Sequence, residues 1–181
     1  MGSARPPQPA KLVVGMLSAS ADRLHLARKL LEGRFGSVDY AGDFLPFEQT
    51  DYYVAELGAP LARQFLAFEP LFQVGDLAQA KLTTNSLEAE LSLAGSRTVN
   101  LDPGYVTAAK LVLATTRDNS HRVYIGEGIY AEVTLRFVRG RFEPWPWTYP
   151  DYASPAVRAV FERIRALYMA QARRRRDIQT G

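Results

Sequence analysis

The chain has 181 residues, of which 47% are hydrophobic and 23% charged, a composition that fits one globular domain and excludes disorder throughout. It contains no cysteine, which excludes disulfides, thiolate zinc sites and a cysteine nucleophile, and no apolar run approaches the roughly 20 residues that span a bilayer. The net charge of +3 derives from the four arginines at 173–176, because 18 basic residues face 19 acidic ones elsewhere, and this near-neutral body makes nucleic acid a weaker candidate partner than a small molecule.

The two ends of the chain differ in composition from the rest. Residues 1–10 form a proline-rich leader, which we expect to be disordered and which lacks the apolar core of a signal peptide. Residues 173–181 form a basic tail, and residues 11–172 are predicted to be a single domain. The absence of cysteine, signal peptide and membrane span predicts a cytoplasmic protein with no membrane partner.

The first half of the chain alternates strands and helices. Apolar runs and helical spacing predict, in chain order, a strand at 11–18, a helix at 21–35 that ends at Gly36, strands at 37–47 and 61–71, and a helix at 75–94. An acidic, aromatic connector at 50–58 separates the second and third strands. A strand at 97–101 would complete the β-α-β-β-α-β order of a ferredoxin-like fold. The sequence therefore predicts an α+β domain whose antiparallel sheet is covered on one face by helices.

The next segment contains the clearest strand pattern of the sequence. Residues 106–116 fit either a helix or a strand, because alanine, lysine and leucine favour the first and valine and threonine the second. Apolar and polar residues alternate from Ile129 to Val138, which predicts a half-buried strand. The alternation assigns one polar sheet face to Tyr130, Glu132, Thr134 and Arg136.

A hairpin and a helix are predicted to close the chain. Arg139-Gly140 indicates a tight turn that leads into a strand at 141–145. Ser154 as the cap and Pro155 at the first helical position, followed by apolar residues three and four apart, predict the terminal helix.

Three residues in the polar-rich stretch from Asn100 to Asp151 are candidates for catalysis. His121 could transfer a proton near neutral pH, Glu132 interrupts the clearest strand, and Asp102 could act as a general base or a metal ligand. Simpler alternatives are a solvated loop histidine, a strand glutamate paired with an arginine, and a turn formed by Asp102-Pro103-Gly104.

Six further residues are candidates for ligand binding. The Arg122 guanidinium could bind a phosphate or carboxylate through two hydrogen bonds. Lys110 lies among apolar residues, so it would need a carboxylate or a ligand phosphate if it were buried, whereas a surface lysine would need neither. The other four candidates are Tyr105, Thr116, Tyr130 and Arg136.

The sequence carries no established cofactor motif. A P-loop run and a Rossmann fingerprint are both missing, and Gly126-Glu127-Gly128 is more typical of a bulge or a close backbone approach. A divalent metal bound by some of Asp102, His121, Glu127, Glu132 and Asp151 stays open, although no two of them have a close ligand spacing.

An aromatic segment, residues 145–152, lies between the predicted hairpin and the terminal helix. Its tryptophans and tyrosines could form the wall of a pocket or stack on a base. Alternatively, the segment packs the helix against the sheet.

Seven runs of sequence follow one another in a recognisable order: KLVVGMLS, TDYYVAELG, KLTTNSLE, NLDPGY, KLVLATT, HRVYIGEGIYAEV and WPWTYPDY. Together they resemble the prokaryotic family called domain of unknown function 4416, over about Lys11 to Tyr168. The resemblance implies a single-domain cytoplasmic protein and brings no activity with it.

The leading functional hypothesis is a binding protein or enzyme for a small anionic ligand, such as a phosphorylated metabolite or a nucleotide. Arg122 and Lys110 would hold the anion, His121 or Glu132 would move a proton, and Asp102 would assist. One alternative is a single-stranded RNA or nucleotide-binding module that uses the polar sheet face. Another is an assembly protein without catalysis that uses the aromatic segment as a contact between copies.

Overall fold

The computed structural model describes residues 2–180 and contains a nine-stranded sheet. The strands follow the order β2-β4-β1-β5-β6-β8-β7, with β3 paired to β4 and β9 to β8, and every pairing is antiparallel. The strands are β1 (Ala10–Ser18), β2 (Val38–Ala41), β3 (Leu45–Phe47), β4 (Leu61–Phe72), β5 (Asn100–Val106), β6 (Lys110–Thr115), β7 (Val123–Gly126), β8 (Ile129–Val138) and β9 (Arg141–Pro144). The helices are α1 (Ala21–Phe35), η1 (Asp51–Tyr53), α2 (Val54–Leu57), η2 (Val74–Asp76), α3 (Leu77–Glu90), α4 (Pro150–Ala153) and α5 (Pro155–Thr180).

The predicted α+β domain is confirmed, and its first part has the ferredoxin-like order. The strands β2, β4, β1 and β5 lie side by side in the sheet, with α1 and α3 as the two connecting helices. Ser20 caps α1 by accepting a hydrogen bond from the Arg23 backbone N–H, and Gly36, with a φ of 93°, ends it as predicted.

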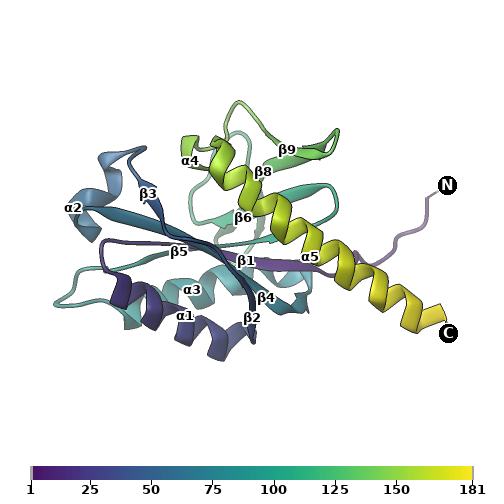
Figure 1. Ribbon diagram of the computed structural model, residues 1–181, viewed down its shortest axis with the longest axis horizontal. Helices are drawn as coiled ribbons and strands as arrows, with labels where there is room; N and C mark the ends of the chain where they lie inside the picture. Colours follow the sequence, from purple (N-terminus) through teal and green to yellow (C-terminus); the bar gives the residue numbers. More distant parts are fainter. Residues whose placement is uncertain (1, 181) are drawn as a thin grey trace.

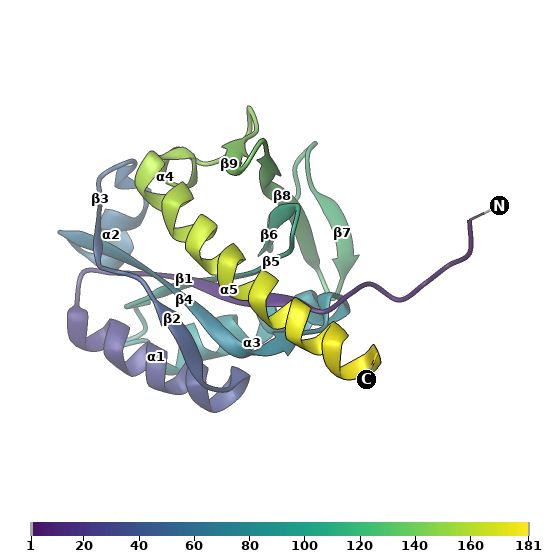
Figure 2. The same cartoon turned by 45° about the vertical axis from the view of Figure 1, so that its right-hand side comes forward.

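The helices form two layers, one on each face of the sheet (Figures 1 and 2). Helices α1 and α3 pack against the side chains of Leu12, Val14 and Met16, on one face of β1. Helix α5, yellow in both figures, crosses the other face and packs against Val13 and Phe65. The prediction that helices cover one face therefore holds for the first two helices, whereas the terminal helix covers the opposite face.

Several predicted boundaries shift. The single strand predicted at 37–47 is two short strands, β2 and β3, which both pair with β4. The predicted helix at 75–94 begins at Leu77, after the 3-10 turn η2, and ends at Glu90. The connector at 50–58 contains η1 and α2, and residues 106–116, which fitted either structure, contain strand β6. Residues 173–180 continue helix α5.

Strand β5 corrects the prediction of a turn at Asp102-Pro103-Gly104. These residues are extended and lie opposite Gly15, Val14 and Val13 of β1. The strand begins at Asn100, three residues after the predicted start at Arg97. Gly104 is required by close packing, because a Cβ at this position would lie 2.3 Å from the carbonyl oxygen of Val112.

A bulge in β8 corrects the prediction of one polar sheet face. Opposite β6, the register of β8 steps from Leu135 paired with Leu111 to Val133 paired with Val112, so Thr134 is the additional residue. Glu132, opposite Leu113, and Leu135 therefore share the α5 face although they are three residues apart. Glu132 and Thr134 are buried, and only Arg136 of the predicted polar face is exposed.

The closing elements agree with the sequence. Arg139 and Gly140 have φ angles of 51° and 86°, as a type I′ hairpin turn requires, and they connect β8 to β9. The Ser154 hydroxyl accepts a hydrogen bond from the Val157 N–H at the start of α5. Within residues 2–180, no helix combines the length and the apolar character needed to cross a membrane.

Candidate functional site

A cavity of about 630 Å³, which we call the main cavity, lies where strands β5 and β6 separate. Their pairing covers Gly104 to Val106 and Leu111 to Leu113, whereas β5 begins at Asn100 and β6 ends at Thr115. Pro103, next to the last pair, has no N–H with which to extend the ladder. The volume is in the range of small-molecule sites.

Residues from both layers reach the main cavity through this opening. The α3 residues come from one face of the sheet and those of α4 from the other. The charged lining residues are Arg63, Lys81, Glu88, Arg97, Asp102, Arg117, Arg122, Glu132 and Asp151, and the aromatic ones are Phe47, Tyr52, Tyr53, Tyr149 and Tyr152.

Arg63 occupies the inner end of the main cavity, with its side chain only 4% exposed. Its Nε lies 3.1 Å from Oδ2 of Asp151, and its Nη1 lies 3.7 Å from Oδ2 of Asp102. The guanidinium carbon lies 4.9 Å from the ring centre of Phe47 and 5.5 Å from that of Tyr152. Two carboxylates and two aromatic rings thus fix this cation in place.

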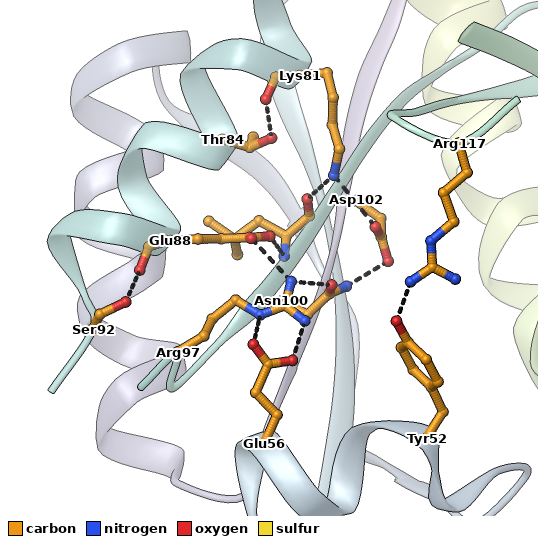
Figure 3. Close-up of polar contacts among 11 residues, drawn as sticks. Tyr52, Glu56, Lys81, Thr84, Glu88, Ser92, Arg97, Asn100, Asp102 and Arg117 are labelled. Atoms are coloured by element: carbon orange, nitrogen blue, oxygen red, sulfur yellow. Dashed lines mark hydrogen bonds and ion pairs between the residues drawn. The ribbon is translucent and has the colours of Figure 1, made fainter. Parts of the chain in front are cut away.

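Asp102 lies at the centre of a set of polar contacts (Figure 3). Asn100 Nδ2 donates to its Oδ2 over 2.7 Å, and the Lys81 ammonium lies 3.6 Å from its Oδ1. The same ammonium donates to the backbone carbonyl of Leu101 over 3.0 Å. The Asp102 carboxylate remains 24% exposed, so it is accessible from the main cavity.

Arg97 connects the α2 segment to helix α3 (Figure 3). Its Nε and Nη2 donate to both carboxylate oxygens of Glu56, over 3.0 and 2.6 Å. Its Nη1 donates to Glu88 and to the side-chain oxygen of Asn100, both over 3.1 Å. Such a bidentate pair fixes geometry as well as charge, so it holds the segment containing Tyr52 and Glu56 beside the main cavity.

Two arginines from the loop before β7 line the outer part of the main cavity. Arg122 is fully engaged: its Nε donates to Glu132 over 2.9 Å, its Nη2 to the Tyr149 hydroxyl over 2.9 Å, and its Nη1 to the Arg117 carbonyl over 3.0 Å. Arg117 is exposed and hydrogen bonds to the Tyr52 hydroxyl, with its guanidinium 4.9 Å from that ring. No carboxylate among the side chains that the structure describes forms an ion pair with Arg117.

Burial changes the acid–base properties of four lining residues. It raises the pKa of the Tyr53 hydroxyl to about 12, with Asp102 as a further cause, and raises that of Tyr152 well above 10. Burial also raises the pKa of the carboxyl groups of Asp151 and Glu88, although Arg63 and Lys81 respectively oppose the effect. Both tyrosines therefore keep their protons at neutral pH and can donate hydrogen bonds.

Four of the predicted site residues meet at the main cavity: Asp102, Thr116, Arg122 and Glu132. His121 lies just outside it, with Nε2 3.3 Å from Oε2 of Glu132 and its ring stacked on Trp147 at 5.5 Å. Its contact with the other candidates is thus through Glu132.

The other four predicted residues lie elsewhere. Lys110 is exposed at the far end of β6, five residues and about 16 Å from Thr115, which agrees with the alternative of a surface lysine. Arg136, opposite Lys110, stacks on Trp145 at 4.5 Å. Tyr105 packs against the apolar cluster that contains Leu77 and Ala78 of α3, and Tyr130 contacts the ring of Tyr124.

The aromatic segment packs on strand β8. Trp147 Nε1 donates to the carbonyl of Val133 and the Thr148 hydroxyl to that of Thr134, which are the carbonyls at the bulge. The rings of Trp145 and Trp147 stack on each other at 5.1 Å. This packing places the following residues, 149–152, at the main cavity, so the segment contributes both to packing and to the cavity wall.

Sequence reasoning missed Arg63, Lys81, Arg97 and Arg117. Arg63 interrupts an apolar strand, and Lys81 lies on the face of α3 that also presents Leu77 and Leu87. For Arg63 and Lys81 the signal was a charged residue on an apolar face, and it is weaker than a cluster because each residue is isolated in the sequence.

The described residues contain no group of three or more histidine, aspartate or glutamate side chains placed to hold one metal ion. The five candidate ligands named from the sequence thus do not form one centre within residues 2–180. Glu127, for example, lies in the turn between β7 and β8, with a φ of 55°.

Comparison with protein families matches residues 8–168 to one family model, described as Domain of unknown function (DUF4416). The chain belongs to this family. The DUF4416 match includes every residue that lines the main cavity. No curated protein and no solved structure matches the chain.

Proposed function

We propose that this chain binds a small anionic ligand, such as a phosphorylated metabolite, in the main cavity. The observation that carries the proposal concerns the five cations that line the cavity: Arg63, Lys81, Arg97 and Arg122 each form an ion pair with a carboxylate, whereas Arg117 forms none with the side chains that the structure describes. The Arg117 side chain bonds instead to the neutral Tyr52 hydroxyl. A guanidinium without a carboxylate partner is suited to a phosphate or carboxylate of the ligand.

The roles expected from the sequence change in this proposal. Arg117 takes the place of Lys110 as the residue that contacts the anion, and Arg122 adds positive charge while it holds the Arg117 carbonyl. His121 and Glu132 contact each other and Arg122, which favours a positioning role. If the ligand is also transformed, Asp102 is the base we propose, because its accessible carboxylate is oriented by Asn100 and Lys81.

The test is a thermal-shift screen in which inorganic phosphate, sugar phosphates and nucleoside monophosphates are added at millimolar concentration and constant ionic strength. A ligand that binds only the folded protein raises the melting temperature. Replacing Arg117 by Gln should weaken binding of the stabilising compound by about tenfold or more, as expected for the loss of a charge-assisted hydrogen bond.

The matched control is Arg141→Gln. Arg141 is exposed on strand β9, outside the main cavity, and its side chain carries the same charge. This variant should bind as the wild type does. The proposal is wrong if no phosphorylated compound stabilises the wild type, or if both variants weaken binding equally.

A further inference from the structure

Three buried side chains at the inner end of the main cavity have polar atoms without hydrogen-bond partners among the described residues. These atoms are Nε and Nη1 of Arg63, Oδ2 of Asp151 and the hydroxyl of Tyr152. Arg63 and Asp151 are close enough for an ion pair, but their contact lacks the geometry of a hydrogen bond. Buried polar groups are nearly always hydrogen-bonded in folded proteins, so these atoms are candidates to form hydrogen bonds with a bound ligand.

The atoms converge because strand β1 has a glycine at this point. A Cβ at Gly15 would lie 2.9 Å from the Tyr152 hydroxyl and 3.2 Å from Nη1 of Arg63. Gly15 therefore leaves room for both groups on the same patch of the sheet, directly opposite Asp102. The donors and the acceptor come from β4 and α4, so they approach the cavity from different elements.

The charges at this end are already balanced. Arg63 lies 3.1 Å from the carboxylate of Asp151 and 3.7 Å from that of Asp102, and Lys81 lies 3.6 Å from Asp102. A further anion here would be repelled by the carboxylates of Asp102 and Asp151. A neutral group could instead form hydrogen bonds with the atoms that lack partners. A hydroxyl suits them, because it can donate to Asp151 and accept from Arg63 or Tyr152.

The aromatic rings at this end favour hydroxyl groups over a flat base. Arg63 covers a face of Phe47, and the Tyr152 ring stacks on Phe161 at 5.8 Å and forms a T-shaped contact with Phe65 at 5.6 Å. These rings are engaged within the protein, and stacking of a nucleobase needs an open ring face.

We infer that the ligand is a phosphorylated sugar or polyol, bound with its hydroxyl groups at Arg63, Asp151 and Tyr152 and its phosphate toward Arg117. The inference rests on the proposed function, since it assigns the phosphate to the outer cations. It adds the chemical class of the ligand and its orientation in the main cavity, with the hydroxyl groups at the inner end and the phosphate at the outer end.

The experiment compares glucose 6-phosphate, ribose 5-phosphate, adenosine monophosphate and inorganic phosphate by isothermal titration calorimetry on the full chain. At least one sugar phosphate should bind more tightly than the other two classes. The variant Tyr152→Phe removes one hydroxyl that has no hydrogen-bond partner among the described residues, so it should fold normally. It should weaken sugar-phosphate binding by about two- to tenfold, the effect of one neutral hydrogen bond, and leave inorganic phosphate binding unchanged.

The control is Tyr168→Phe, which removes the hydroxyl of a buried tyrosine on α5 that bonds to Pro9, outside the main cavity. It should leave every affinity unchanged. Equal binding of inorganic phosphate and sugar phosphates, a preference for the nucleotide, or an unchanged affinity in Tyr152→Phe would overturn the inference while the proposed anion site stands. Failure of all phosphates to bind would instead overturn the proposed function.

Discussion

At the scale of single residues, the pair formed by Arg122 and Glu132 links the predicted site to the stability of the fold. The two side chains are 5% and 2% exposed, and they lie 2.9 Å apart. Glu132 also accepts from the Thr134 hydroxyl over 3.3 Å. The sequence predicted both residues as functional, and the structure gives them a bonding role that is sufficient to explain their burial.

Replacing Arg122 by Ala should destabilise the protein strongly, because it leaves the Glu132 carboxylate buried without its arginine. Losses of this kind are about 3–5 kcal/mol. Urea denaturation would measure the change in the free energy of unfolding. Arg117→Ala is the control, since its exposed side chain should cost only about 0.5 kcal/mol or less. Similar losses in the two variants would show that the pair with Glu132 is not the cause.

The double variant Arg122→Met with Glu132→Leu distinguishes two causes of destabilisation: an unpaired buried carboxylate and the loss of the other hydrogen bonds of Arg122. It removes both charges and keeps apolar volume, so it should recover much of the stability that Arg122→Ala loses. A double variant as unstable as the single one would assign the effect to the bonds of Arg122 with Tyr149 and the Arg117 carbonyl.

At the scale of elements, the separation of β5 from β6 creates the main cavity. The two strands are held close where they pair, because Gly104 has no Cβ to meet the Val112 carbonyl. Beyond this pair the strands separate, and side chains from α3 and α4 approach from the two faces. Gly104 therefore marks the point at which the paired part of the two strands ends and the main cavity begins.

Replacing Gly104 by Ala should destabilise the protein by about 1–3 kcal/mol or more, as overpacking does, because the strands must move apart. Gly33→Ala is the matched control with the opposite expected sign. Gly33 lies in helix α1, and a methyl group added there would meet no neighbouring atom within 4 Å, so alanine should stabilise by up to about 1 kcal/mol. Thermal or urea unfolding of both variants would check the two signs, and a neutral Gly104→Ala would contradict the close approach.

At the scale of the whole molecule, helix α5 connects the main cavity to the basic end of the chain. Asp151 and Tyr152 shortly precede it, and its 26 residues span about 39 Å. Lys11, which is fully buried, forms an ion pair with Asp39 and donates to Gln171 over 2.9 Å, so it holds this helix on the sheet. The arginines at 173–176 follow this contact along the helix, toward the end remote from the cavity.

Deleting residues 173–181 should leave ligand binding in the main cavity unchanged. The deletion removes four arginines and one aspartate, so 18 basic residues remain against 18 acidic ones. Any weak, salt-dependent binding of single-stranded RNA should be lost with the tail. Calorimetry with the ligand and a fluorescence titration with RNA at two salt concentrations would measure both effects. RNA binding that survives the deletion would support the alternative of a nucleic-acid module.

The sequence alone determined most of the elements and the family. Strands β1, β4 and β8, helix α1 and the turn at Arg139-Gly140 follow from local spacing and from residues that begin or end an element, which are properties of neighbours in the chain. It also brought Asp102, Arg122 and Glu132 into consideration, because polar residues are dense in the stretch from Asn100 to Asp151. The tertiary structure decided the rest.

The bulge at Thr134 moved Glu132 onto the face of Leu135, and the pairing of β1 with β4 and β5 brought Arg63 beside Asp102, which lies 39 residues later. Lys110, a candidate from its apolar neighbours, lies at the exposed end of its strand. Such placements depend on strand register and on which strands pair, and these are set by packing over the whole domain. The sequence therefore identified residues that could form a site, whereas only the fold determined which of them meet.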